Sequence, residues 1–175
     1  QEPVHVIPGS MAFETPEVSS QKAHFRASCE IKNDTQQDVQ ITAKFRLVKT
    51  ESTESAIENC SSAADKMQAE VSVNMHIPAG TACRAKATGE VLSPALWSPD
   101  SPDLYTLETR LCPADDVSGE ACCGKEYMAD SRRVGIRSIR FDPDTGFFLN
   151  DKNMLIKGVC VHHDAGCLGA AVPVP

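Results

Sequence analysis

The sequence predicts an all-β protein built as an antiparallel β-sandwich. The main observation is a repeated alternation of apolar and polar residues, which is unbroken from Val39 to Leu47. Such a pattern is typical of a strand that buries one face and exposes the other to water. Clusters of turn-forming residues separate the alternating runs, and no segment has the spacing of a long amphipathic helix. About seven half-buried strands joined by short turns indicate a sandwich of the immunoglobulin type.

Seven segments are predicted to be these strands. They lie at residues 11–14, 25–31, 39–47, 71–77, 83–91, 105–111 and 127–137. Residues 32–35 and 78–80 are predicted turns between neighbouring strands. The polar, serine-rich segment 50–66 is predicted to be an extended loop, with a short helical turn near residues 62–67.

After Arg137 the strand and turn signals follow one another more closely. Residues 139–141 and 147–149 are predicted strands on either side of the turn at residues 142–146. A second turn at 150–153 leads into a strand predicted at 154–161. We therefore expect consecutive hairpins, the last of which runs directly into His162.

Composition narrows the class of function. The chain carries a formal net charge of -7, which argues against a nucleic-acid-binding protein and gives no attraction to anionic membranes. Apolar residues make up 41% and charged residues 23%, as expected for a chain with a packed core. No apolar run approaches the roughly 20 residues of a membrane-spanning helix. The first residues lack a basic-then-apolar signal sequence, although an excised or mature chain would look the same.

The eight cysteines are more consistent with free thiols than with a metal site. They are Cys29, Cys60, Cys83, Cys112, Cys122, Cys123, Cys160 and Cys167. No Cys-x-x-Cys pair of the zinc-ribbon kind is present. Several stand where small core residues belong, and a chain of this length does not require disulfide bonds to fold. In an oxidising compartment, disulfides remain the alternative.

Two sequons for asparagine-linked glycosylation occur, at Asn33-Asp34-Thr35 and Asn59-Cys60-Ser61. They bear on structure only in a eukaryotic secretory protein. We interpret them as chance matches in a bacterial protein.

Several motifs in the chain resemble those of glycoside hydrolase family 2, which includes β-galactosidases, β-glucuronidases and β-mannosidases. The segment LWSPDSPDLYTLETRL at residues 96–111 resembles a hallmark of that family, and VGIR at 134–137 resembles its Gly-Phe/Ile-Arg motif. FFLNDKNMLIKGV at 147–159 resembles a family hairpin, and GSMAFETPEVS near the start resembles its entry strand. The motif positions are Leu96, Trp97, Pro99, Pro102, Tyr105, Gly135, Arg137 and Gly158.

The resemblance implies an architecture larger than this chain. Family enzymes carry a jelly roll, then an immunoglobulin-like sandwich, then a (β/α)8 barrel. The chain resembles the sandwich at residues 1–138 followed, at 139–175, by hairpins and the first strand of a truncated barrel. Its expected partners are therefore the jelly roll and barrel of a parent enzyme, and homo-oligomer contacts are compatible with the sequence. A periplasmic or secreted bacterial protein is favoured over a cytoplasmic one.

The resemblance also implies that this chain carries no catalytic residue. The two catalytic glutamates of the family lie on later barrel strands, and retaining hydrolysis needs both carboxylates about 5 Å apart. Acidic residues such as Glu108, Asp142 and Asp144 are interpreted as solvated charges on strand faces and turns. Trp97 stands in a proline-flanked corner, where packing is favoured over stacking on a sugar. No cofactor is expected, and carbohydrate would be bound only through the missing barrel.

The motif GVCVHHDAG raises the question of a metal site at His162, His163 and Asp164. Adjacent side chains on a strand point to opposite faces, so the two histidines do not easily share one ion, and no third ligand is evident. By resemblance, His162 takes the place of a histidine near the sugar in the intact parent. His163 and Cys160 depart from the family's usual glutamate and asparagine, while the His-His-Asp variant most resembles a β-galactosidase branch. We therefore predict no metal site.

Two functions follow as alternatives. The first is a non-catalytic structural domain of a family 2 enzyme, in which a self-contained sandwich supports its neighbours. The second is a stand-alone carbohydrate-binding or adhesive immunoglobulin-like module, which would need an exposed aromatic cluster or a calcium-type acidic loop. Neither feature is evident in the sequence.

Overall fold

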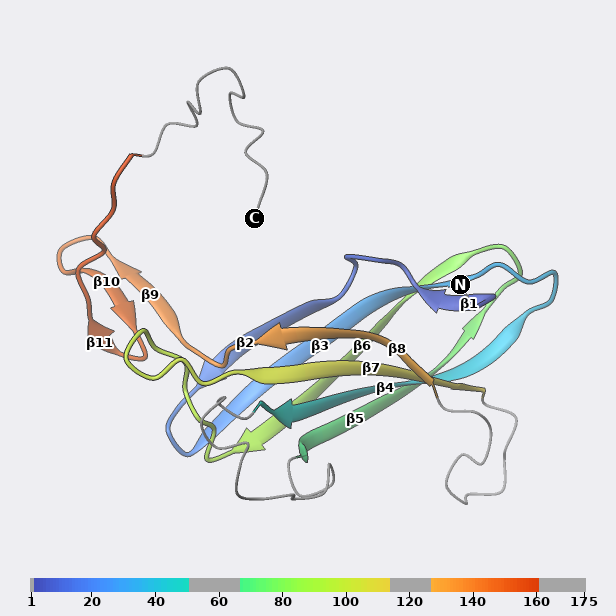
Figure 1. The fold of residues 1–175 in the computed structure, drawn as a ribbon, viewed down its shortest axis with the longest axis horizontal. Coiled ribbons are helices and arrows are strands. Elements are labelled where there is room, and N and C mark those ends of the chain that lie inside the picture. The colour runs from blue at the N-terminus through green and yellow to red at the C-terminus, as the bar shows by residue number, and fades with distance from the viewer. Residues whose placement is uncertain (1, 51–66, 114–126, 161–175) are drawn as a thin grey trace, which may run out of the picture.

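The computed structural model describes residues 2–50, 67–113 and 127–160 of the chain. The described part is a two-layer antiparallel β-sandwich with a small third sheet at one end (Figure 1). Its strands are β1 (Val4–Val6), β2 (Ala12–Val18), β3 (Lys22–Asn33), β4 (Val39–Lys49), β5 (Met67–Ile77), β6 (Ala82–Leu92), β7 (Tyr105–Pro113), β8 (Tyr127–Val134), β9 (Ile139–Asp142), β10 (Gly146–Leu149) and β11 (Lys152–Asn153). The prediction of an antiparallel all-β sandwich is therefore confirmed.

The first sheet of the sandwich is organised around β3. Strands β1 and β2 pair with opposite halves of one edge of β3, and β6 pairs with the whole of the other edge. The second sheet has the order β5-β4-β7-β8. The neighbouring strands β4 and β7 are separated in the chain by β5 and β6, as in the Greek-key arrangement of immunoglobulin-like sandwiches.

The core lies between the two sheets and follows the alternation in the sequence. Phe25 and Ile31 of β3 face Phe45 and Leu47 of β4, and each is at most 1% exposed. The intervening residues, such as Arg26, are exposed or half-buried on the outer face. Full burial of one such side chain contributes about 2 kcal/mol, so period-two patterning fixes which face of each strand turns inward.

Three details of the predicted strands are corrected by the structure. β1 was not expected, because three residues are too short to show alternation. Lys32 and Asn33 belong to β3 rather than to the following turn, which starts at Asp34. The strand predicted at 154–161 is wrong for residues 154–160: after β11, the amide of Met154 donates to the carbonyl of Phe147 (2.9 Å), and no ladder follows in the described residues.

In the third sheet, β11-β10-β9, strands β9 and β10 form the hairpin that the sequence predicted after Arg137. Its third strand, β11, forms at Lys152–Asn153, where the sequence predicted a turn. The third sheet, which we call the hairpin sheet, lies at one end of the sandwich, whereas β1 lies toward the opposite end (Figure 1). The first barrel strand, expected to continue from it, stays a prediction. Across the described residues, no helix has the length and apolar character needed to cross a membrane.

Candidate functional site

The segment between β6 and β7, which carries most of the hallmark motif, is fixed to the end of the sandwich by Tyr105. Its phenol is only 1% exposed, and its oxygen accepts a hydrogen bond from the amide of Ala95 at 2.8 Å. Burial raises the pKa of the Tyr105 phenol, so the group stays neutral and acts as an acceptor. The tyrosine therefore anchors the loop that presents Trp97.

Trp97 contacts Ile136 and Arg137, which follow β8 in the chain. Its amide donates to the carbonyl of Ile136 at 2.8 Å, and the guanidinium of Arg137 lies 5.0 Å from the centre of its ring. Gly135 lies against the same indole: a Cβ added there would lie 3.0 Å from Trp97 Cβ and 3.2 Å from Cγ. A larger residue at this position would therefore crowd the tryptophan side chain.

Asn150 connects this corner to the hairpin sheet. Its Nδ2 donates to the carbonyl of Trp97 and its Oδ1 accepts from the amide of Ser138, each at 3.0 Å. Its own amide donates to the carbonyl of Ser138 at 3.0 Å, and its φ of 49° is one that asparagine tolerates better than most residues. We call Trp97, Ile136, Ser138 and Asn150 the junction. Sequence reasoning missed Asn150, since it placed the residue only in a turn.

The structure gathers some of the predicted motif residues and separates others. Leu96 packs against the core, and Trp97, Gly135 and Arg137 meet at the junction. Pro99 and Pro102 lie exposed in a turn closed by reciprocal backbone bonds between Ser98 and Ser101. Gly158 is exposed, with open space where a Cβ would stand. His162, together with His163 and Asp164, lies outside the described residues.

The described carboxylates with perturbed acidity are not suited to donate a proton at neutral pH. Hydrogen bonds from Thr145 lower the pKa of Asp142, and Lys32 and Lys22 lower those of Asp34 and Glu90 respectively. A glycosidase acid requires a raised carboxyl pKa, which comes from burial or from a like charge. These three groups are therefore ionised surface charges.

Metal-binding chemistry finds no support within residues 2–50, 67–113 and 127–160, where no three His, Cys, Asp or Glu side chains gather as ligands. Cys29, Cys83 and Cys160 are free thiols. Burial raises the pKa of the Cys29 thiol to about 12, because the thiolate would lose its hydration in the core. Cys29 is therefore a packing residue and a poor nucleophile.

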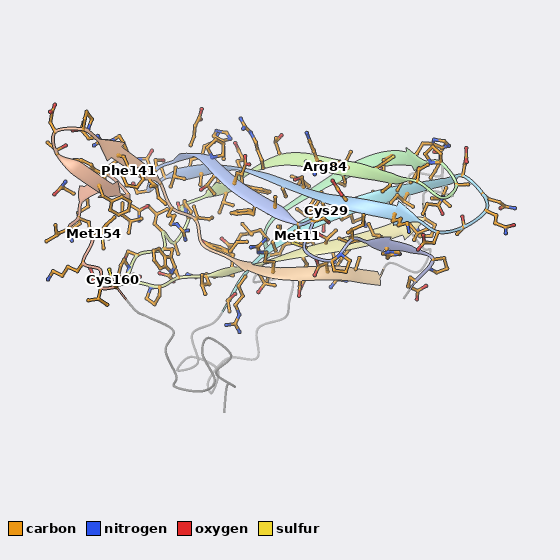
Figure 2. All side chains as sticks on the ribbon, turned by 90° about the horizontal axis from the view of Figure 1, so that it is seen from above. Met11, Cys29, Arg84, Phe141, Met154 and Cys160 are labelled. Carbon is orange, nitrogen blue, oxygen red and sulfur yellow. The ribbon has the colours of Figure 1, made fainter. Side chains whose placement is uncertain are left out.

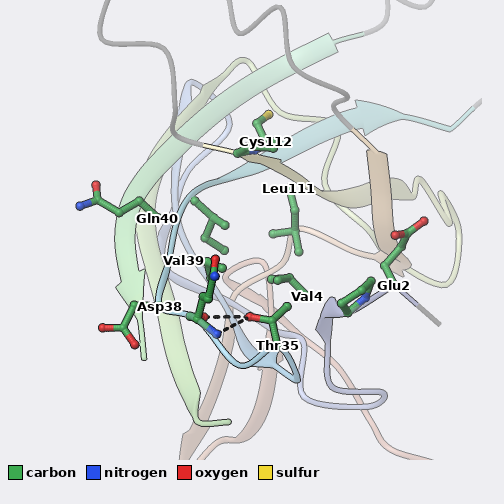
Figure 3. Close-up of a pocket in the computed structure, with 12 residues that line it drawn as sticks. Glu2, Val4, Thr35, Asp38, Val39, Gln40, Leu111 and Cys112 are labelled. Carbon is green, nitrogen blue, oxygen red and sulfur yellow. Dashed lines mark hydrogen bonds between the residues drawn. The ribbon is translucent and has the colours of Figure 1, made fainter. Parts of the chain in front are cut away.

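A surface cavity of about 520 Å³ opens at the end of the sandwich opposite to the junction (Figure 3). Glu2, Thr35, Asp38 and Gln40 supply its polar lining, and Leu111 its apolar floor. The Thr35 hydroxyl donates to the carbonyl of Gln37 at 2.8 Å. Because that bond closes the 34–38 turn, the Thr35 hydroxyl serves the local backbone.

Comparison with known proteins decides the family. The model of the glycosyl hydrolases family 2 matches residues 10–137. The chain belongs to glycoside hydrolase family 2. A β-galactosidase of Bacteroides ovatus is 45% identical over 82 residues, which is 47% of this chain and 9% of that protein. A putative β-glucuronidase of Formosa agariphila is 28% identical over 99% of this chain and 14% of its own length.

A solved structure of a family 2 member from Bacteroides cellulosilyticus shares the fold. It superposes with a TM-score of 0.73 at 27% identity, over 97% of this chain and 19% of that one. The chain thus spans less than a fifth of the length of each of these relatives. They are much longer proteins, of which this chain corresponds to a domain-sized part.

Proposed function

We propose that this chain is the non-catalytic, immunoglobulin-like structural domain of a retaining, β-galactosidase-like family 2 enzyme, with residues 1–138 as the sandwich and 139–175 leading into its barrel. The observation that carries the proposal is the junction. One asparagine side chain bridges the sandwich loop and the hairpin sheet, with both its donor and its acceptor in use. Such an arrangement supports the proposal, because it holds in one direction the chain that leaves the sandwich toward the expected next domain.

The outer surface of the hairpin sheet supports this role. Phe141 is 72% exposed and Ile139 52% exposed, and beyond β11 the side chains of Leu155, Ile156 and Val159 are exposed as well. Clustered exposed apolar side chains are typical of a surface that packs against another part of a protein. The expected neighbours are the jelly roll and barrel of the parent. The sugar-contacting role of His162 in the intact parent stays a prediction.

The stand-alone sugar-binding module gains no support from the described residues. Trp97 is half-buried under Arg137, and the Phe141 and Phe147 rings are tilted by 50° against one another. A sugar-binding platform presents exposed flat rings side by side, which these contacts do not provide.

The isolated 175-residue chain is expected to hydrolyse no glycoside. The assay is release of nitrophenol from the nitrophenyl β-galactoside and β-glucuronide, chosen because the relatives carry both names. Only background rates are expected, since retaining hydrolysis needs two carboxylates about 5 Å apart and the catalytic glutamates of the family lie on barrel strands. Turnover that follows the protein through two chromatographic steps would contradict the proposal.

The junction is tested with Asn150→Ala. Loss of the bridge is expected to detach the hairpin sheet from the sandwich at a cost of about 1 kcal/mol. Because Trp97 is the only tryptophan, its fluorescence reports on this corner alone. We expect emission at longer wavelength and easier acrylamide quenching, with the near-ultraviolet signal of the core retained.

The matched control is Asn153→Ala. Asn153 donates only within the hairpin sheet, to the carbonyls of Thr145 and Phe147. This variant is expected to leave Trp97 emission unchanged. Equal responses of Trp97 to both substitutions would show that Asn150 does not couple the two parts.

A further inference from the structure

Strand β6 forms a long and regular edge of the first sheet. Among the described residues it pairs only with β3, from Ala82 opposite Lys32 to Leu92 opposite Lys22, without any register shift. It contains no proline. Its other edge therefore leaves a row of backbone donors and acceptors that a further strand would satisfy.

The other outer strands of the two sheets carry features that discourage such pairing. β2 contains Pro16 and a register shift between Glu14 and Glu17. The ladders of β5 and β8 are each interrupted by a register shift, and β1 has only three residues. Prolines, bulges and short length are the usual protection of sheet edges. β6 has none of these.

Open space lies beside β6 and extends across the first sheet. A surface groove of about 730 Å³ is lined by residues 84 and 86–88 of β6, by residues 26–28 of β3, by Ala12 and Glu14 of β2, and by residues 71–73 of β5. Arg84 lies on the first sheet (Figure 2), and its side chain is 55% exposed. A strand approaching in the plane of the first sheet therefore meets exposed side chains and unpaired backbone.

The outward side chains of β6 are complementary to themselves when two copies run antiparallel. In an antiparallel pair, two residues that lie directly opposite each other point to the same face of the sheet. A register that placed an outward residue of one copy opposite an inward residue of the other would therefore bury a charged side chain, and such registers are excluded. A two-fold axis at Ala87 places Arg84 opposite Glu90 and Ala82 opposite Leu92 of the second copy, and pairs the whole strand. An axis at Lys86 would place that lysine opposite itself. An axis at Thr88 would shorten the ladder and place Arg84 opposite Leu92.

Ion pairs within each copy add to the charge complementarity between the two β6 strands. Within one copy, Arg84 pairs with Glu30 at 2.5 Å, and Glu90 pairs with Lys22 at 2.6 Å. In the register centred on Ala87, a row of alternating charges crosses the contact. It runs from Glu30 to Arg84 of one copy and then to Glu90 and Lys22 of the second copy. The two-fold axis generates a second, identical row in which the two copies exchange roles. Alternating rows of this kind favour one register over its neighbours.

We propose that β6 is a self-association edge, through which two copies of the chain pair antiparallel about a two-fold axis at Ala87 and join their first sheets into one. The contact is isologous, so it closes at a dimer and does not grow into a fibre. Backbone hydrogen bonds supply the attraction, and the pairing of Arg84 with Glu90 sets the register.

Sedimentation velocity of the 175-residue chain over a concentration series tests the proposal. We expect the mass to rise from that of the 18.9 kDa monomer toward twice this value. Arg84→Glu and Glu90→Arg each place like charges opposite one another twice, and each is expected to raise the dimer dissociation constant at least about tenfold. An equimolar mixture of the two variants restores both attractive pairs and is expected to recover the dimer.

Arg26→Glu is the matched control. Arg26 lies on the same outer face, one strand in from the edge, and makes the same charge change when substituted. It is expected to leave dimerisation unchanged, and near-ultraviolet circular dichroism checks that each variant is folded. A chain that stays monomeric throughout the series would overturn the proposal, and so would a dimer that both edge variants keep. Loss of the dimer in both variants without recovery on mixing would exclude the register centred on Ala87.

Discussion

Replacement of Asn33 by alanine is expected to lower the free energy of unfolding by about 3 kcal/mol, because it leaves buried backbone groups without partners. Asn33 is fully buried at the end of β3. Its Nδ2 donates to the carbonyls of Gln37 at 2.8 Å and Ile77 at 3.1 Å. Its Oδ1 accepts from the amide of Thr35 at 2.9 Å. One side chain thus joins β3, the 34–38 turn and the end of β5.

Asn74→Ala is the matched control for Asn33→Ala. Asn74 is exposed on β5, and its Oδ1 accepts one hydrogen bond from the Thr42 hydroxyl at 2.8 Å. Its loss is expected to cost about 0.5 kcal/mol or less. Urea denaturation of the two variants gives the comparison, provided that the slopes agree. Similar losses in both would show that the buried network at Asn33 does not stabilise the fold.

The same network bears on glycosylation. In the sequon at Asn33, the nitrogen that would carry a glycan is buried and donates two hydrogen bonds. The folded chain therefore offers no acceptor there, which supports the interpretation of this sequon as a chance match. The second sequon, at Asn59, lies outside the described residues.

Gly89→Ala is expected to destabilise the sandwich by about 2 kcal/mol through overpacking between the two sheets. A Cβ at Gly89 would lie 2.6 Å from Phe25 Cζ and 2.8 Å from Val71 Cγ1. The Phe25 ring cannot move aside easily, because it is 1% exposed and stacks on Phe13 with ring centres 5.7 Å apart. Both neighbours are therefore held in place by the core.

The control for this substitution is Gly158→Ala. Gly158 is exposed, its φ is not in the left-handed region, and nothing lies within 4 Å of the position that a Cβ would take. The expected change is within about 0.5 kcal/mol. Thermal or urea unfolding of both variants measures the difference. If the Gly89→Ala protein were as stable as the Gly158→Ala protein, the two sheets would have to move apart near residue 89 at no cost in free energy.

Alternation predicted the strands best where a strand buries one face completely. β3, β4 and β7 lie in the middle of their sheets, and period two identified the inward residues within the predicted runs, although not Ala23 and Asn33 at the two ends of β3. The short outer elements were less predictable. β1 has too few residues to show a pattern, and the strand expected at 154–161 requires a neighbour that the described residues do not contain.

The sequence predicted most residues of the candidate site, but it did not predict the hydrogen bonds that join them. The motif around Trp97, Gly135 and Arg137 is visible in the sequence, and the structure shows that these residues meet. Asn150 was not identified, because an asparagine in a turn is ordinary. Its bonds to Trp97 and Ser138 depend on where the hairpin sheet folds back.

The sequence by itself determined the class of fold, the inward face of each long strand and the family of the protein. These follow from local alternation and from motifs that are contiguous along the chain. Only the tertiary structure decided which strands form edges, that Asn150 bonds the sandwich loop to the hairpin sheet, that Asn33 satisfies buried backbone groups, and that Gly89 lies against Phe25. The physical reason is that each depends on contacts between residues far apart in the chain, and a periodic pattern carries no information about which strand becomes the neighbour of which.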